Sequence, residues 1–189
     1  MRKISEIDER LQSFIESQHM FFVATAPSGP EGHINVSPKG LESLRVLGPA
    51  TIAYVDHTGS GVETIAHLRE NGRIVIMLCA FAGPPRIVRL HGHGEAIEPQ
   101  DAEFAALLEK LGGSHPARSI IRVHVERISD SCGFAVPLFQ FQEQRIQLTK
   151  WAAGKGESGL LEYQRAKNAK SIDGLPGLRR VEDSKDMPS

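Results

Sequence analysis

Cysteine is scarce in this sequence, and that scarcity limits the chemistry available to the chain. The 189 residues include two cysteines, Cys79 and Cys132, which do not form a C-x-x-C pair. Two separated cysteines do not make the framework of a disulfide-stabilised secreted domain, and they fit a reducing compartment better. We therefore assign neither thiol a special role.

An excess of one sign of charge and long apolar runs are also absent from the sequence. The formal net charge is −1 and the pI is about 6.7, so no overall field draws the protein onto nucleic acid or an anionic membrane. Residues 1–14 are charged and lack the apolar core of a signal peptide, and no 18 consecutive residues are apolar. We expect a cytoplasmic protein that binds neither nucleic acid nor membrane and holds any anion locally.

Hydrophobic residues are plentiful, at 40% of the chain, which is enough for the core of one domain. Their helical spacing predicts an opening helix over residues 4–18, with Ser5 placed to cap it. Alternating apolar residues between Gly and Pro turns predict six strands, at residues 19–26, 32–37, 50–55, 73–81, 86–97 and 119–128. Further helices are predicted at residues 62–71, 99–111, 144–153 and 159–170.

The order of these segments argues against a doubly wound parallel sheet, because strands and helices do not alternate regularly. It favours a mainly β fold with flanking helices, of the α+β class. Six antiparallel strands suit a small barrel. A four-residue turn at 82–85 would join the two longest strands as a hairpin.

The segment 56–64 has the pattern of an anion site, because a strand ends in a glycine turn and a helix begins at once. Backbone N–H groups at a helix start carry partial positive charge, and Thr58, Ser60 and Thr64 add hydroxyl donors. A dinucleotide fingerprint is disfavoured because Thr64 stands where the third glycine belongs. A simple turn capped by Ser60 is the alternative.

Basic residues support the anion site. No Asp or Glu occurs from residue 71 to 94, whereas Arg73, Arg86 and Arg89 lie in that stretch and Lys39 lies in an earlier turn. Such cations suit a bound phosphate. The alternative is that each arginine points into solvent from an alternating strand.

The sequence patterns that would indicate a metal site or a catalytic nucleophile are weaker. His91 and His93 share a strand face, but no third ligand is near them in sequence, so we predict no metal site. The stretch 129–133 lacks the G-x-S-x-G pattern of a hydrolase.

Three segments together resemble the pyridoxamine 5′-phosphate oxidase-like family. Residues 33–40, HINVSPKG, are similar to the strand and turn that the family places against a flavin. Residues 58–81 are similar to its phosphate-binding turn, helix and next strand, and the likeness continues through residues 83–94. The resemblance covers about residues 10 to 128.

This resemblance implies a six-stranded FMN-binding split barrel that pairs as a homodimer, with FMN in clefts at the interface. Residues 1–133 would form the flavin-binding domain, and residues 134–189 a helical extension packed on the same domain or on the dimer partner. Ser37, Pro38 and Lys39 would lie near the isoalloxazine and ribityl chain. The remaining residues expected to bind the cofactor are Asp56, Thr58, Gly59, Ser60, Gly61, Thr64, Arg89 as basic partner, and Trp151 as a ring that closes the cleft.

The sequence departs from the family pattern at one informative place. Pyridoxamine phosphate oxidases have an Arg-Lys pair at the start of the helix, where this chain has Glu63 and Thr64. It also lacks their C-terminal substrate motif. We therefore expect an FMN-dependent oxidoreductase acting on a different small molecule. The alternatives are a non-catalytic flavin-binding protein, and a relative that binds a deazaflavin or, through His57, His91 or His93, haem.

Overall fold

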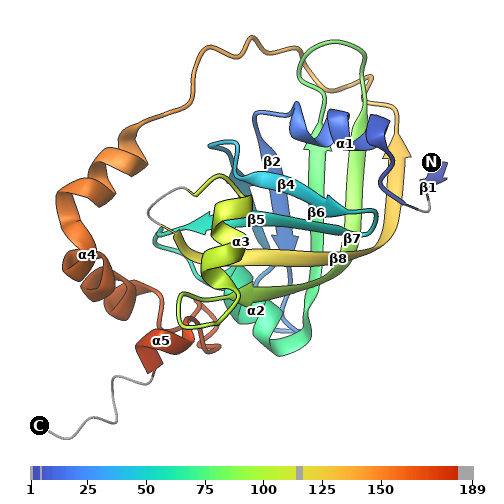
Figure 1. Ribbon diagram of the computed structural model, residues 1–189. Helices are drawn as coiled ribbons and strands as arrows, with labels where there is room; N and C mark the ends of the chain where they lie inside the picture. The colour runs from blue at the N-terminus through green and yellow to red at the C-terminus, as the bar shows by residue number, and fades with distance from the viewer. Residues whose placement is uncertain (1, 5, 114–116, 183–189) are drawn as a thin grey trace, which may run out of the picture.

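A single antiparallel sheet organises the chain in this computed structural model, which describes residues 2–4, 6–113 and 117–182. Seven strands follow each other in the order β3-β2-β6-β7-β8-β5-β4, and β1 pairs with β8 as an eighth. The strands are β1 Arg2–Ile4, β2 Phe21–Thr25, β3 Asn35–Lys39, β4 Leu44–Gly48, β5 Thr51–His57, β6 Arg73–Cys79, β7 Ile87–Ile97 and β8 Ala117–Ser131. The α+β class and the antiparallel arrangement predicted from the sequence are confirmed (Figure 1).

The prediction of six strands is too low, since β1 and β4 were not recognised. Both are short, and β4 is an edge strand whose Arg45 interrupts its apolar pattern. Among the described residues, β3 and β4 end the path without pairing to each other, so the sheet is not a closed barrel. The expected four-residue hairpin turn is also longer, because pairing of β6 with β7 stops at Cys79 and Ile87.

Helix α1, Glu9–Glu16, is shorter than the predicted span 4–18 because β1 occupies the start of that span. Asp8 is its N-cap, and the Asp8 carboxylate accepts the backbone N–H of Leu11 at 2.8 Å. Ser5, the predicted cap, lies outside the described residues. Leu11 and Ile15 face the core from one side of α1, as the helical spacing predicts.

Helix α2, Glu63–Asn71, agrees with its prediction and ends at Gly72, whose φ of 70° lies in the left-handed region that glycine tolerates best. Helix α3, Phe104–Lys110, begins later than predicted. The two C-terminal helices predicted at 144–153 and 159–170 form one element, α4 Gln147–Lys167, broken at Gly156. Helix α5, Arg179–Glu182, follows a loop and was not predicted.

The core lies between the concave face of the sheet and helices α1 and α2. It contains Ile52, Tyr54, Ile76 and Leu90 from the three strands β5, β6 and β7, all fully buried. After β8, an extended segment crosses the molecule and brings α4 to its opposite side (Figure 1). The chain then returns to the barrel, where Leu178 is fully buried.

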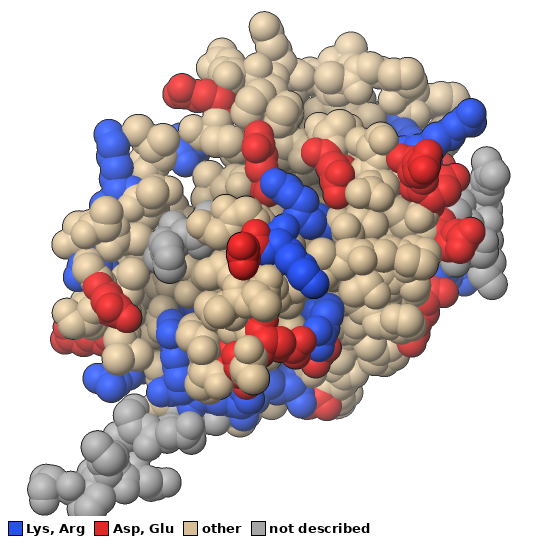
Figure 2. Space-filling model, viewed as in Figure 1, with Lys and Arg blue, Asp and Glu red and all other residues tan. Residues whose placement is uncertain are grey.

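The surface agrees with the balanced composition. On the face shown in Figure 2, basic and acidic side chains are interspersed and form no extended patch of one sign. For example, Arg122 in β8 forms ion pairs with Glu95 and Glu103. None of the helices in the described ranges is long and apolar enough to cross a membrane.

Candidate functional site

The turn from β5 into α2 leaves the start of the helix open. Val62 is the N-cap of α2, and no side chain accepts a hydrogen bond there. The first N–H groups of a helix have no partner within the helix, so an uncapped start is available to an anion. The turn itself is fixed from outside, because the Asn168 side-chain amide donates to the carbonyl oxygens of Gly59 (2.9 Å) and Ser60 (3.3 Å).

Two cations converge beside this turn on one buried carboxylate. Lys39 Nζ lies 2.8 Å from Asp56 Oδ1, and Arg118 Nε lies 2.8 Å from Asp56 Oδ2. Asp56 is fully buried, and burial alone would raise the pKa of its carboxyl. Arg118 and Lys39 outweigh that effect and hold the pKa of Asp56 well below its usual value. Asp56 is therefore ionised, and it balances one of the two cations.

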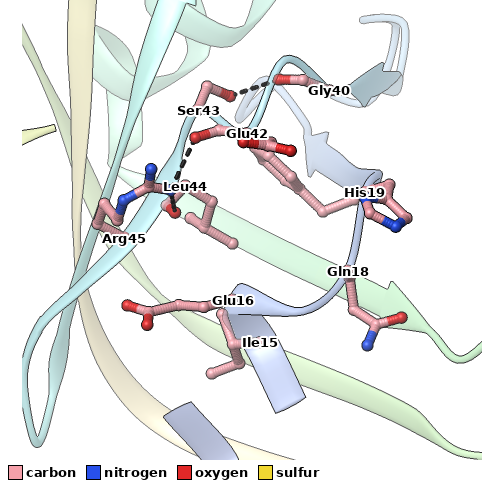
Figure 3. A pocket seen from close by; sticks show the side chains of 10 residues that line it. Ile15, Glu16, Gln18, His19, Gly40, Glu42, Ser43, Leu44 and Arg45 are labelled. Carbon is pink, nitrogen blue, oxygen red and sulfur yellow. Dashed lines mark hydrogen bonds between the residues drawn. The ribbon is translucent and has the colours of Figure 1, made fainter. Parts of the chain in front are cut away.

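The turn that follows Lys39 is held in a defined shape. Leu41 and Glu42 both have positive φ, at 60° and 52°, a region that costs energy for residues other than glycine. Hydrogen bonds brace the turn, from Ser43 Oγ to the Gly40 carbonyl at 2.8 Å and from Arg45 to the Glu42 carbonyl at 2.7 Å (Figure 3). The recess beside this turn has a volume of only ≈ 10 Å³, so it holds no ligand. The effect of the braced turn is to fix the position of Lys39.

A polar network links β3 to the start of α2. The Asn35 side-chain amide donates to Thr64 Oγ1 at 3.0 Å and to Thr25 Oγ1 at 3.3 Å, while Ser37 Oγ donates to Asn35 Oδ1 at 3.0 Å. Thr25 Oγ1 also lies 2.9 Å from Nδ1 of the buried His67. Asn35 thus fixes the orientation of both hydroxyls that face the site, Ser37 and Thr64.

These groups line one cleft of ≈ 280 Å³ between β3 and the start of α2. Its lining residues are Asn35, Ser37, Pro38, Lys39, His57, Gly59, Gly61, Glu63, Thr64 and Arg118. The two ring nitrogens of His57 are buried and have no hydrogen-bond partner among the described residues. Burial lowers the pKa of His57, against an opposing effect of Asp56. A neutral imidazole can therefore both donate to and accept from a ligand in this cleft.

Glu63 brings a second carboxylate into the cleft. Its Oε1 accepts the backbone N–H of Ile172 at 3.3 Å, which ties the side chain to the C-terminal segment. A Cβ atom on Gly61 would lie 2.5 Å from Glu63 Oε2, so the Glu63 carboxylate folds closely over the turn at this glycine. Lys39, Arg118, Asp56 and Glu63 together carry no net charge.

The cleft brings together six of the eleven predicted cofactor residues: Ser37, Pro38, Lys39, Gly59, Gly61 and Thr64. Asp56 lies beneath it and contacts Lys39. Thr58 faces the other side of the turn, where its hydroxyl accepts a hydrogen bond from Gln164 at 2.8 Å. Ser60 is exposed outside the cleft lining.

Arg89 and Trp151 lie apart from the cleft within one chain. Arg89 donates to Ser131 Oγ at 3.2 Å on the β7–β8 face, and Trp151 packs edge-on against Tyr163 within α4, 5.0 Å between ring centres. The arginine that lines the cleft is Arg118, which the sequence did not indicate. Arg118 is 62 residues from Asp56 and meets it only because β8 pairs with β5.

No three His, Cys, Asp or Glu side chains come together as a metal site in the described ranges 2–4, 6–113 and 117–182. His93, one of the two strand histidines, is paired with Glu126 at 2.8 Å.

Comparison with known proteins agrees with this fold. Residues 7–132 match the pyridoxamine 5′-phosphate oxidase family. A pyridoxamine 5′-phosphate oxidase family protein of Aspergillus flavus, ustO, is 42% identical over 191 residues, covering 91% of this chain and 76% of that protein.

Two solved structures share the fold. HupZ of Group A Streptococcus superposes with a TM-score of 0.54 at 25% identity, over 66% of this chain and 93% of that one. A Lactobacillus delbrueckii protein classed with the pyridoxamine 5′-phosphate oxidases gives a TM-score of 0.52 at 18% identity, over 68% and 99%. The predicted split-barrel architecture is confirmed, and the chain belongs to the pyridoxamine 5′-phosphate oxidase family.

Proposed function

We propose that this protein binds FMN in the cleft between β3 and α2 and uses it as a flavin-dependent oxidoreductase on a small molecule other than pyridoxamine phosphate. The observation that carries the proposal is the convergence of Lys39, Arg118 and the uncapped start of α2 on one cleft. Membership of the family supports a flavin cofactor. The lining of the cleft supports its placement there.

The donor set fits most of an FMN molecule. Lys39 and Arg118 supply positive charge for the phosphate end, together with the helix start and the Thr64 hydroxyl. Ser37, Asn35 and the neutral His57 offer donors and acceptors suited to ribityl hydroxyls and a flavin ring edge. When bound, the flavin supplies the electron sink, and the protein positions it and excludes water.

The Glu63 carboxylate would repel the FMN phosphate, so removing its charge should measurably change FMN binding. We expect Glu63→Gln to tighten FMN binding about tenfold, because it removes a carboxylate from the cleft while keeping an acceptor for the Ile172 N–H. Quenching of FMN fluorescence measures the dissociation constant. Glu109→Gln, an exposed change in α3, is the control and should leave binding unchanged. Equal affinity of Glu63→Gln and wild type would show that the phosphate binds elsewhere.

A second copy of the chain is part of the proposal. The outer face of β3 exposes Ile34 (76%) and Val36 (61%), while alternate residues of the same strand face the cleft. Large apolar side chains gathered on an edge strand suit a protein interface. We propose that the homodimer forms over this face, with residues 134–189 as an extension that packs on the barrel or the partner.

Val36→Glu is therefore expected to convert the dimer to a monomer, because it places a carboxylate in an apolar interface. Light scattering coupled to size-exclusion chromatography gives the mass directly. Leu47→Glu changes an exposed apolar residue of β4, at the other end of the strand order, and should leave the dimer intact. A Val36→Glu protein that still has twice the chain mass of 20.7 kDa would place the interface on another face.

The function itself is tested by titrating the purified protein with FMN and then adding a reduced nicotinamide under anaerobic conditions. We expect a 1:1 complex whose visible flavin absorption bleaches on reduction and returns with an electron acceptor. FMN that binds but is never reduced would leave a flavin-binding protein without this activity. Failure to bind FMN would refute the proposal.

A further inference from the structure

A larger cavity lies on the opposite side of the turn that borders the cleft. It has a volume of ≈ 530 Å³, lies between α4 and the barrel, and is partly open to solvent. Phe104 and Ala117 line it from the barrel side, and Ala152 and Leu160 from α4. This volume is within the range of small-molecule sites, and mainly apolar walls are typical of them. Thr58 faces this cavity, whereas Gly59 and Gly61 line the cleft, so the two spaces are distinct.

The break in α4 shapes this cavity. Gly156 has φ 64° and ψ 179°, which no residue inside a regular helix adopts, and it lies in the cavity wall. The two halves of α4 therefore point in different directions and curve around the space (Figure 1). A straight helix would present only one of its halves to the barrel.

The polar end of the cavity contains a guanidinium group whose hydrogen bonds are incomplete. Arg180 donates through Nη2 to Gln164 Oε1, and Gln164 donates in turn to Thr58 Oγ1 at 2.8 Å. Arg180 Nε is buried and has no hydrogen-bond partner within the described part of the chain. A buried donor without an acceptor is costly, and in native proteins it usually marks a missing ligand, ion or water.

Among the described residues, the carboxylates near Arg180 do not bond to its guanidinium group. The buried Glu98 accepts the Arg180 backbone N–H at 3.2 Å, and its side-chain partner is the neighbouring Arg179, which also pairs with Asp101. Glu157 lines the cavity and is exposed, so water screens it. Burial lowers the pKa of Arg180, and Glu98 opposes that shift. An anion inside the cavity would supply the acceptor that Arg180 Nε lacks.

We propose that this cavity is a binding site for an amphipathic carboxylate, whose carboxylate accepts from Arg180 and whose apolar body packs against α4, Phe104 and Leu160. A planar guanidinium is suited to a carboxylate because it offers parallel N–H donors. The apolar walls exclude a small, strongly hydrated anion. The site is independent of the flavin cleft.

Octanoate is a suitable probe, and isothermal titration calorimetry measures its binding to the full chain. We expect one octanoate per chain, and at least tenfold weaker binding of 1-octanol, which lacks the charge. Arg180→Met should weaken octanoate binding at least tenfold, because it removes the charge-assisted hydrogen bonds. Arg165→Met, which removes an exposed cation from the same helix α4, should not change it.

A second variant tests the cavity without changing Arg180. Ala153→Leu narrows the space from the α4 side and should also weaken octanoate binding. Thermal melting and FMN titration of each variant check that the fold and the cleft are intact, which separates this proposal from the flavin proposal. Absence of octanoate binding to wild type would overturn the inference, as would equal binding by Arg180→Met or, if that variant does not fold, by Ala153→Leu.

Discussion

Asp56→Ala is expected to lower the free energy of unfolding by about 3–5 kcal/mol, the usual cost of removing one partner from a buried ion pair. Asp56 is fully buried, and the Arg118 side chain beside it is only 4% exposed. Without the carboxylate, the Arg118 charge remains buried without its counter-ion. Chemical denaturation monitored by circular dichroism measures the change.

Asp130→Ala is the matched control, because Asp130 also pairs with an arginine, Arg86, at 2.7 Å, but both side chains are partly exposed. Its expected cost is about 1 kcal/mol or less. Equal losses in the free energy of unfolding for the two variants would contradict a larger stabilising contribution from the buried Asp56 pair.

The same network predicts acid sensitivity. The pKa of Asp56 is depressed in the folded state, so its contribution to stability is complete above the unfolded pKa of about 3.9. That contribution is lost progressively as the pH falls below this value towards the folded pKa. Below about pH 4, the free energy of unfolding should therefore fall less steeply with decreasing pH in Asp56→Ala than in the wild type. If the free energy of unfolding falls equally steeply below about pH 4 in the variant and the wild type, other carboxylates determine the acid sensitivity.

Lys39→Met is expected to weaken FMN binding by about 10- to 100-fold, which corresponds to losing one charge-assisted hydrogen bond of about 1.5–3 kcal/mol. Lys39 is the partly exposed cation of the cleft, whereas Arg118 is buried, so Lys39 is better placed to reach a ligand. Arg118 remains to balance Asp56 in the variant. FMN fluorescence quenching gives the dissociation constant.

Two comparisons make this prediction specific. Lys39→Arg keeps the charge and should bind FMN within a few-fold of wild type. Lys150→Met removes an exposed lysine from α4 and should have no effect. If Lys39→Met binds as tightly as wild type, the phosphate does not use this cleft.

Local patterns predicted those parts of the structure that local interactions determine. Helix α2 was found because Asn71 and Gly72 end an apolar face of period 3.6, and Gly72 takes the left-handed conformation expected there. Ser37 and Lys39 were placed by resemblance, and both line the cleft. The alternation of β3 puts both residues on one face.

Tertiary pairing decided what the sequence could not show. Arg118 reaches Asp56 through the β5–β8 register, and nothing near Arg118 in the chain signals this contact. Thr58 was expected in the anion site, but Gln164, 106 residues away, draws its hydroxyl to the other side. Strand β1 has only three residues, and β4 buries only Leu44, so neither strand has a recognisable alternating pattern.

A crystal structure of the protein grown with FMN would show where the cofactor binds. We expect flavin density in the cleft between β3 and α2, with phosphate oxygens within hydrogen-bond distance of Lys39 Nζ or Thr64 Oγ1. FMN bound outside this cleft, or a cleft that stays empty at saturating FMN, would contradict this expectation.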